Sequence, residues 1–167
     1  MEIPNLETQR LLLRPYRPED FETYAAINGD PEVMRYIRAA EDRPTAFRSF
    51  CAVIGHWTAR GYGMWAVEER ATRRHIGGAG LIRWEGRSLE IGYAFEPAAW
   101  GKGYATEASR RALDYAHGAV GARGVVAVIH PDNHASISVA QRIGARFDRE
   151  LMEKQERLLV YRFPDPA

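Results

Sequence analysis

Residues 89–106 read Leu-Glu-Ile-Gly-Tyr-Ala-Phe-Glu-Pro-Ala-Ala-Trp-Gly-Lys-Gly-Tyr-Ala-Thr, and this stretch decides the fold. In residues 89–95 a large side chain stands at every second position, as in a strand packed on one face. Apolar residues then recur at helical spacing over residues 104–119. An unbroken apolar run follows at residues 125–129 and suits a strand buried on both faces. The stretch therefore predicts a parallel strand–helix–strand unit.

The chain on both sides of this unit also changes between strand and helix periodicity. The pattern predicts strands at residues 11–13, 63–68, 75–84, 89–95, 125–129, 145–151 and 157–163, and helices at residues 18–29, 31–37, 44–60, 104–119 and 133–143. Gly77, Gly78 and Gly80 interrupt one strand pattern and predict a bulge or a close backbone approach. We therefore predict an α+β fold over residues 1–167, a single domain with one mixed, mostly antiparallel sheet of about seven strands flanked by helices.

Composition and charge exclude several classes of protein. Lys and Arg number 23 against 22 acidic residues, which gives no cationic field of the kind that gathers nucleic-acid phosphates. The single cysteine, Cys51, cannot form an internal disulfide, and its place in the 44–60 helical pattern predicts that it lies in the core. No run has signal-peptide or membrane-spanning character. We expect a cytoplasmic protein without nucleic-acid or membrane partners.

Residues 100–106 place two glycines and an alanine where a strand gives way to a long helix. Small residues let a ligand approach the backbone, and the free N–H groups and dipole of a first helical turn suit a pyrophosphate. An ordinary glycine turn explains the same spacing. A Walker loop is absent from the sequence, and Thr106 occupies the third glycine position of the dinucleotide-binding pattern.

The same residues resemble the acetyl-CoA loop of the GNAT superfamily of N-acetyltransferases, whose pattern is Gln or Arg, two free positions, Gly, one free position, and Gly or Ala. Gly103 and Ala105 match, whereas Trp100 replaces the Gln or Arg, as in similar loops of the RimJ/RimL-like branch. Asn133 and Ser136 resemble the Asn-x-x-Ser helix that flanks the pantetheine arm in this superfamily. The resemblance covers most of residues 8–162. It implies a GNAT fold, acetyl-CoA as co-substrate, and a monomer or homodimer.

The resemblance also implies a binding site. Near Phe95, residues 89–95 would splay from residues 125–129 to admit pantetheine, and a backbone N–H near Ala94 or Phe95 would stabilise the oxyanion. The implied acetyl-CoA contacts are Tyr93, Ala94, Phe95, Trp100, Gly101, Lys102, Gly103, Tyr104, Ala105, Thr106, Asn133, Ser136 and Arg142. We predict no metal site, because Pro131 after His130 argues against a helical face shared with His134.

Four side chains are candidates for the chemistry. Glu90 stands beside Gly92 and Ala94 on one strand face, where a carboxylate could meet a substrate amine; a solvent-facing strand carboxylate is the alternative. By resemblance, Ser136 would protonate the departing thiolate, with Tyr104 and Tyr93 as alternative donors. Asn133 and Ser136 also suit the start of a helix for purely local reasons.

Together with the resemblance, these observations predict direct acetyl transfer to a primary amine in a ternary complex. By resemblance the acceptor is a protein N-terminal amine, as in ribosomal-protein acetyltransferases. An amino acid, polyamine or aminoglycoside amine is the alternative, and a non-catalytic CoA-binding module is the rival from another class. We expect the acceptor to enter from the side formed by residues 16–62 and the C-terminal strands.

Overall fold

The computed structural model describes residues 2–166; Met1 and Ala167, the two ends of the predicted domain, lie outside the described residues. Within that range one sheet has the strand order β1-β2-β3-β4-β5-β6-β8-β7. The strands are β1 (Leu6–Glu7), β2 (Leu11–Arg14), β3 (Met64–Glu69), β4 (Arg74–Ile82), β5 (Glu90–Phe95), β6 (Val126–Ile129), β7 (Arg146–Glu153) and β8 (Glu156–Arg162). The helices are α1 (Phe21–Gly29), α2 (Pro31–Met34), α3 (Arg43–Arg60), α4 (Tyr104–Gly118) and α5 (His134–Arg142), with 3₁₀ turns η1 (Pro18–Asp20) and η2 (Pro97–Ala99).

The predicted α+β fold with one mixed sheet is confirmed. The β5–β6 pair is parallel and is joined through α4, as the central stretch predicts, whereas the other neighbouring strands pair antiparallel. Over the described residues the sheet has eight strands rather than about seven. The additional strand, β1, has two residues, which is too short to produce an alternating pattern.

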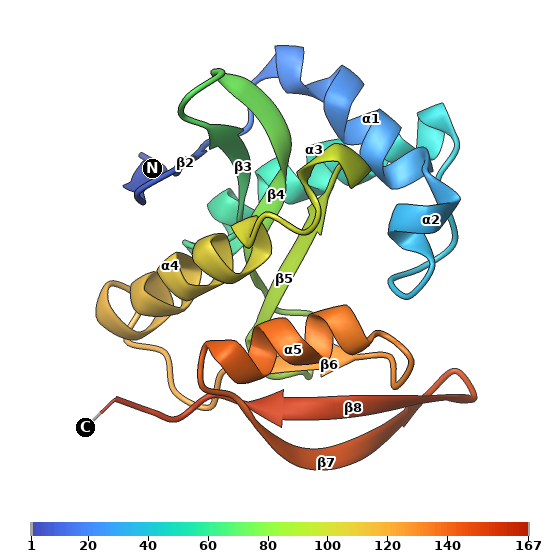
Figure 1. The fold of residues 1–167 in the computed structure, drawn as a ribbon, viewed down its shortest axis with the longest axis vertical. Helices are drawn as coiled ribbons and strands as arrows, with labels where there is room; N and C mark the ends of the chain where they lie inside the picture. Colours follow the sequence, from blue (N-terminus) through green and yellow to red (C-terminus); the bar gives the residue numbers. More distant parts are fainter. Residues whose placement is uncertain (1, 167) are drawn as a thin grey trace.

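Helices cover both faces of the sheet. In Figure 1, β5 passes between α4 and α5. Helices α1 and α2 lie at the upper right, near the end of β5 that leads on to α4. Tyr115 of α4 packs edge-on against Trp65 of β3, with ring centroids 5.2 Å apart. On the opposite face, Ala94 of β5 packs against the apolar cluster formed by Ile27, Val33 and Met34. Because neighbouring side chains on a strand point to opposite faces, β5 presents one side to α4 and α5 and the other to α1 and α2.

Glycines in β4 allow this close packing. A Cβ on Gly78 would lie 2.2 Å from the Tyr16 hydroxyl, and one on Gly77 would lie 2.5 Å from the Ala94 carbonyl oxygen. The β3–β4 register also shifts between Val67 and Glu68. The predicted close approach and the predicted bulge are therefore both present in this strand.

The prediction that Cys51 belongs to the core is wrong. Helix α3 buries Ala46, Phe50 and Trp57, which follow one another at intervals of four and seven residues, whereas Cys51 is exposed. Successive residues of an α-helix are about 100° apart around its axis, so Cys51 turns away from the stripe that contains Phe50. The apolar pattern of residues 44–60 is broader than the face that the fold buries.

A buried ionic cluster fixes the entry into α1. The Arg14 guanidinium donates to both Asp20 carboxylate oxygens, at 2.7 and 2.8 Å, and to Glu68 Oε2 at 2.8 Å. The three side chains are only 5%, 3% and 5% exposed. Burial by itself raises the pKa of the Asp20 carboxyl, but the hydrogen bonds from Arg14 and from the Arg17 backbone outweigh it and hold that pKa below its usual value. The cluster joins β2, η1 and β3.

We expect Asp20→Asn to lower the free energy of unfolding by about 3–5 kcal/mol at pH 7, because it leaves Arg14 partly uncompensated in a buried site. Since the folded-state pKa of Asp20 is depressed, its contribution is complete above the unfolded-state pKa of about 3.9 and is lost as the pH falls through the folded-state value. Urea unfolding of the wild type and of Asp20→Asn, at pH 7 and at successively lower pH, measures the difference between their free energies of unfolding. This difference should become smaller as the pH falls. Glu22→Gln, which removes the exposed pair with Arg43, is the control and should leave stability unchanged.

Candidate active site

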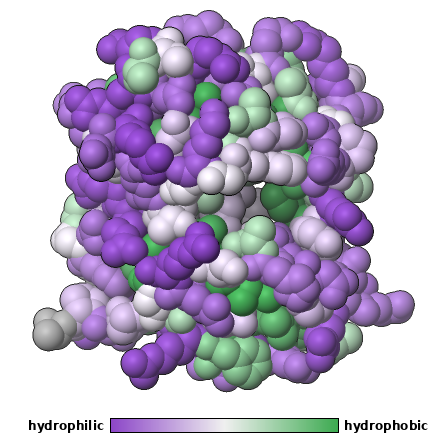
Figure 2. All heavy atoms as spheres, viewed as in Figure 1, coloured by the Kyte–Doolittle hydropathy of each residue, from purple (hydrophilic) through white to green (hydrophobic). Residues whose placement is uncertain are grey.

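The parallel strands β5 and β6 pair at one position and then separate. Their register consists of Glu90 opposite Val126, and the Val126 N–H donates to the Leu89 carbonyl at 2.9 Å. On its other edge β5 pairs with β4 along its whole length, from Glu90 to Phe95. The rest of β5 therefore borders a cleft of about 1430 Å³. Figure 2 shows this face of the molecule hollowed near its middle, with pale and hydrophobic residues around the opening.

Backbone polar groups of β5 point into this cleft. Along an antiparallel strand these groups turn alternately toward and away from the neighbouring strand. The Leu89 carbonyl accepts from Val126 and the Phe95 carbonyl accepts from the Trp100 indole N–H at 2.9 Å, so the odd-numbered residues face away from β4. We infer that the N–H groups of Tyr93 and Phe95 are directed into the cleft. The N–H of Ala94, one of the two positions predicted for oxyanion stabilisation, faces Gly78 in β4 instead.

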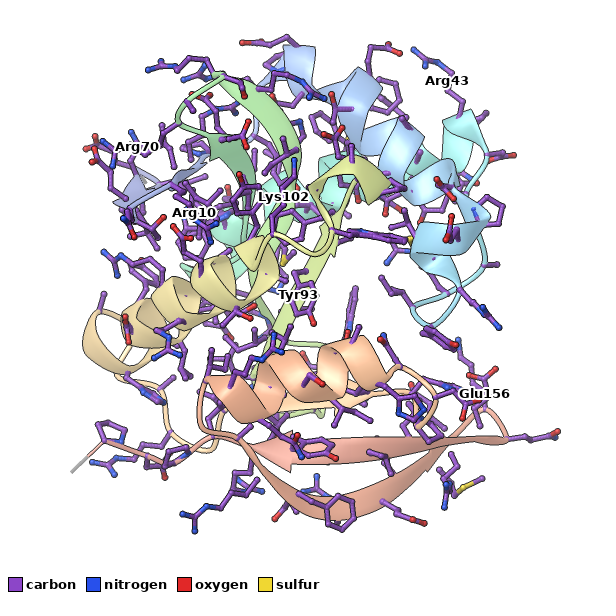
Figure 3. All side chains as sticks on the ribbon, in the orientation of Figure 1. Arg10, Arg43, Arg70, Tyr93, Lys102 and Glu156 are labelled. Atoms are coloured by element: carbon purple, nitrogen blue, oxygen red, sulfur yellow. The ribbon has the colours of Figure 1, made fainter. Side chains whose placement is uncertain are left out.

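The glycine loop lies at one end of the cleft, directly before α4. Gly101 and Gly103 have φ values of 73° and 80°, in the left-handed region that glycine adopts without strain. Gly103 is the N-cap of α4 and has no side chain to satisfy the first-turn N–H groups. Arg10 donates to the Lys102 carbonyl at 2.8 Å, which ties the loop to the start of β2. Figure 3 shows Lys102 and Arg10 together at this end of α4.

Tyr104, one of the residues considered as a proton donor, lines the cleft, but its hydroxyl is engaged by a carboxylate. Its hydroxyl donates to Glu69 at the end of β3, and the Arg10 guanidinium lies 4.7 Å from its ring centroid. The hydrogen bond to Glu69 raises the pKa of Tyr104. Tyr104 is the first residue of α4 and its hydroxyl meets Glu69 of β3, whereas Ser136 is bonded to Tyr93.

Tyr93 and Ser136 lie together across the cleft. The Tyr93 hydroxyl donates to Ser136 Oγ at 2.9 Å, and Figure 3 shows Tyr93 between α4 and α5. Burial raises the pKa of Tyr93, and the hydrogen bond to Ser136 offsets part of that rise. Because Tyr93 supplies the proton of this bond, the proton of the Ser136 hydroxyl remains for another acceptor. Asn133 Oδ1 accepts from the Ser136 N–H at 3.1 Å, so Asn133 does cap α5.

Glu90 is on the opposite face of β5, beside Gly92 and Ala94, as the alternation predicts. Its side chain is 16% exposed and lies 3.2 Å from Arg87 Nε, so it is not the solvent-facing carboxylate of the alternative interpretation. Burial raises the pKa of Glu90; Arg87 opposes the rise and Glu153 adds to it. The site thus contains a carboxyl group with a raised pKa on one side of β5 and a hydroxyl pair on the other.

Sequence reasoning missed Ser109 of α4. Its side chain is fully buried and the residue lines the cleft, yet among residues 2–166 its Oγ has no hydrogen-bond partner. The available signal was its position: Ser109 shares a helix face with Leu113 and Ala116, four and seven residues later, and is the one small polar residue on that buried face. A buried hydroxyl without a partner costs free energy unless a ligand supplies the bond.

The α1–α2 side of the cleft is aromatic and also carries the charged side chains of Glu32, Arg35 and Arg38. Tyr16 and Tyr24 pack edge-on with ring centroids 5.8 Å apart, and burial raises the pKa of both, that of Tyr24 to about 12. Arg38 pairs with Glu41 at 2.9 Å, and Arg87 pairs with Glu153 at 2.9 Å. The predicted entry side for an acceptor, residues 16–62 and the C-terminal strands, does line the cleft.

Arg142 stands in the last turn of α5, at the opposite end of that helix from Ser136. Its side chain is exposed and the residue lines the cleft, and its carbonyl accepts from Arg110 of α4 at 3.0 Å. Among residues 2–166 no group of three or more His, Cys, Asp or Glu side chains is arranged to hold a metal ion. Within the same residues, the helices are too short or too polar to cross a membrane.

Two distant structures share this fold. RimL, the ribosomal L7/L12 alpha-N-protein acetyltransferase solved with coenzyme A, is 14% identical, with a TM-score of 0.81 over 97% of this chain and 98% of its own. The spermidine N-acetyltransferase from Vibrio cholerae, solved with CoA and spermine, is 21% identical, with a TM-score of 0.76 over 93% of this chain and 94% of its own. At these identities the likeness concerns the fold alone.

Closer similarities extend along almost the whole chain. YkkB of Bacillus subtilis, an uncharacterized protein, is 32% identical over 93% of each chain. An acetyltransferase from Agrobacterium tumefaciens is 29% identical, with a TM-score of 0.89 over 99% of this chain and 96% of its own. The family model described as the acetyltransferase (GNAT) domain matches residues 10–146. The chain therefore belongs to the GNAT family of acetyltransferases.

Proposed function

We propose that this protein uses acetyl-CoA to acetylate a primary amine, by direct transfer in a ternary complex. The observation that carries the proposal is the divergence of β5 from β6 beside the uncapped N-terminus of α4. The cleft admits a narrow chain such as pantetheine, and the helix end suits its pyrophosphate. The Tyr93 and Phe95 N–H groups would bind the amide and thioester carbonyls of that chain.

The remaining predicted contacts surround this path. Gly101 and Gly103 leave the loop backbone open to the phosphates, and Lys102 adds a positive charge beside them. Trp100 is exposed, and its indole N–H is already bonded to Phe95, so it would shape the loop rather than replace a Gln or Arg contact. Arg142 would contact acetyl-CoA from the last turn of α5, where its carbonyl is bonded to Arg110 of α4.

The residues around the cleft could carry the transfer as follows. Glu90 accepts a proton from the acceptor ammonium, and the neutral amine attacks the thioester carbonyl carbon. The developing oxyanion is stabilised by a β5 N–H group. When the C–S bond breaks, the nitrogen of the intermediate gives its second proton to solvent water, and Ser136 gives its proton to the thiolate. Ser136 then recovers a proton from solvent through the Tyr93 hydroxyl, so both hydroxyls end protonated and the one proton released overall is the one on Glu90. The C–N bond replaces the C–S bond, with an amide and free CoA as products.

Positioning should provide most of the acceleration. Holding the amine against the carbonyl is worth roughly 7–11 kcal/mol, whereas a general base typically contributes about 10²- to 10⁴-fold in rate. The two β5 N–H groups and the paired hydroxyls are held by secondary structure, so they need little reorganisation during the reaction.

A protein N-terminal amine is the acceptor that we propose. A polyamine site requires several unpaired carboxylates, yet three of the glutamates that line the cleft, Glu85, Glu90 and Glu153, are paired with arginines, which leaves Glu32 and Glu156. Arg35 and Lys154 also line the cleft and would repel a polycation. The two distant structures named above act on different amines, a ribosomal protein and spermidine, so they do not choose between the acceptors.

Thiol release from acetyl-CoA, measured with N-terminal peptides, polyamines, amino acids and aminoglycosides, tests this function. Turnover confined to peptides would support the proposed acceptor, and turnover confined to polyamines would overturn it. Tight binding of acetyl-CoA without turnover on any amine would favour a non-catalytic CoA-binding module. Competition binding against ATP and NAD checks that the loop selects acetyl-CoA.

We expect Glu90→Gln to reduce kcat by about 10²- to 10⁴-fold without abolishing turnover, because it removes a general base but preserves the cleft. The wild-type rate should rise with pH as Glu90 loses its proton, and this rise should be displaced above the usual carboxyl range because its pKa is raised. Stopped-time assays from pH 5 to pH 9 measure the profile, with the amine held constant. An unchanged profile in the variant would exclude Glu90 as the base.

We expect Ser136→Ala to lower kcat more than it changes KM, since the serine acts on the leaving thiolate. Tyr93→Phe should have a smaller effect, because Ser136 keeps its own proton. Steady-state kinetics measure both variants. Ser138→Ala, on the same helix with its hydroxyl bonded to the His134 carbonyl, is the control and should behave as wild type. Equal effects of Ser136→Ala and Ser138→Ala would refute a specific donor at Ser136.

We expect Ser109→Ala to stabilise the ligand-free protein by about 1–3 kcal/mol, because it removes a buried hydroxyl that has no partner. The same variant should bind acetyl-CoA more weakly if the hydroxyl bonds the co-substrate. Thermal unfolding without ligand and KM for acetyl-CoA measure the two effects. A loss of stability together with an unchanged KM would show that the hydroxyl serves only the helix.

A further inference from the structure

We propose that Arg87 and Glu153 are positioning residues, which together hold the Glu90 carboxylate at the acceptor side of the cleft and set the pH range in which it can accept a proton. The inference rests on the proposed role of Glu90 as base. It assigns a catalytic purpose to the C-terminal hairpin, formed by β7 and β8, which contributes no reacting group of its own.

One guanidinium connects two carboxylates from distant parts of the chain. Arg87 Nε lies 3.2 Å from Glu90 Oε1, and Arg87 Nη1 donates to both oxygens of Glu153, at 3.0 and 2.9 Å. Glu153 is separated from Arg87 by 66 positions in sequence. The shared cation therefore links the start of β5 to the end of β7.

Both ends of this link are held in place by backbone structure. The Arg87 N–H donates to the Trp84 carbonyl at 3.1 Å, and the Arg87 carbonyl accepts from Arg83 Nε at 3.1 Å, so the turn before β5 is fixed. Glu153 is the last residue of β7 and pairs with Glu156 across the hairpin. Between them, Lys154 and Gln155 have φ values of 46° and 71°, as in the tight two-residue turns that match strand twist.

The electrostatic balance at Glu90 depends on these two groups in opposite senses. Burial is the largest influence and raises the pKa of Glu90; Arg87 lowers it and Glu153 raises it. The Glu90 side chain is 16% exposed, against 26% for Arg87 and 39% for Glu153, so the innermost charge is the one proposed to react.

The other charged residues that line this end of the cleft are Glu85, Lys154 and Glu156. Glu85 pairs with Arg60 at 2.6 Å and is 91% exposed, so solvent screens it strongly. Lys154 and Glu156 have opposite charges and flank the hairpin turn, and Figure 3 shows Glu156 near the end of the hairpin. Arg87 and Glu153 are thus the pair that decides the charge felt by Glu90.

If the Arg87–Glu153 ion pair had only a structural role, its removal would have a different effect on the pH profile. Arg87→Met and Glu153→Gln both remove the Arg87–Glu153 ion pair, so a loss of local structure would change activity in the same direction in both. If the pair acts through Glu90, the variants shift its titration in opposite directions. Arg87→Met leaves the mostly buried Glu90 carboxylate without its cation, which should raise the pKa of Glu90 further. Glu153→Gln leaves Glu90 as the only carboxylate paired with Arg87, which should lower that pKa.

The test is the pH dependence of kcat/KM for the full-length protein with one acceptor amine. We expect Arg87→Met to move the midpoint of the acidic limb upward by about one pH unit or more, the usual effect of losing an adjacent opposite charge. Glu153→Gln should move it downward by a smaller amount, and Arg87→Lys should restore most of the wild-type midpoint. Glu150→Gln, which cuts the Arg157 pair on the same hairpin, is the matched control and should leave the midpoint unchanged.

A carbon-13 NMR titration of the side-chain carboxyl groups reads the same shifts without turnover. The Glu90 signal is identified by its absence in Glu90→Gln. Shifts in the same direction in both variants, or no shift in either, would overturn the inference while leaving Glu90 as the base. If Glu90→Gln itself retains the wild-type acidic limb, the proposed base is wrong and the inference falls with it.

Discussion

The single pairing position between β5 and β6 is the constraint on which the rest of the site depends. The Val126 N–H donates to the Leu89 carbonyl, and beyond that point no strand of the described chain pairs with the cleft edge of β5. Backbone groups that a continuous sheet would satisfy are consequently available to a ligand. On its other edge β5 remains paired with β4 from Glu90 to Phe95, so these groups are held rigidly. An open edge inside an ordered sheet gives a pre-organised site at little entropic cost on binding.

Strand alternation separates the two sides of the proposed chemistry. Tyr93 faces α5 and reaches Ser136, while Glu90 is directed to the face covered by α1 and α2. In the proposed chemistry one proton thus leaves the amine on one side of β5, and a different proton reaches the departing thiolate from the other side. The separation keeps the Glu90 carboxylate from accepting a hydrogen bond from the Tyr93 hydroxyl, although the two residues stand only three positions apart on the strand.

Buried charge fixes the scaffold on the acceptor side. The Arg14–Asp20–Glu68 cluster determines how the chain leaves β2 and enters α1, which brings Tyr16 against Gly78 and the apolar residues of α1 and α2 against Ala94. The network around Arg87 anchors the C-terminal hairpin to the start of β5 in the same manner. The Arg87 network lines the cleft directly, whereas the Arg14 cluster lies behind it and holds the chain next to Tyr16, which lines the cleft.

Periodicity and glycine placement within short stretches were enough to predict the α+β fold, the order and approximate bounds of the elements, the crossover through α4 and the glycine turn before it. Tertiary structure alone decided which polar groups meet. Tyr93 rather than Tyr104 reaches Ser136, Cys51 is exposed, Glu90 shares Arg87 with Glu153, and Ser109 is left without a partner. Local pattern specifies a side chain's face on its own element, whereas its partner depends on how distant elements pack.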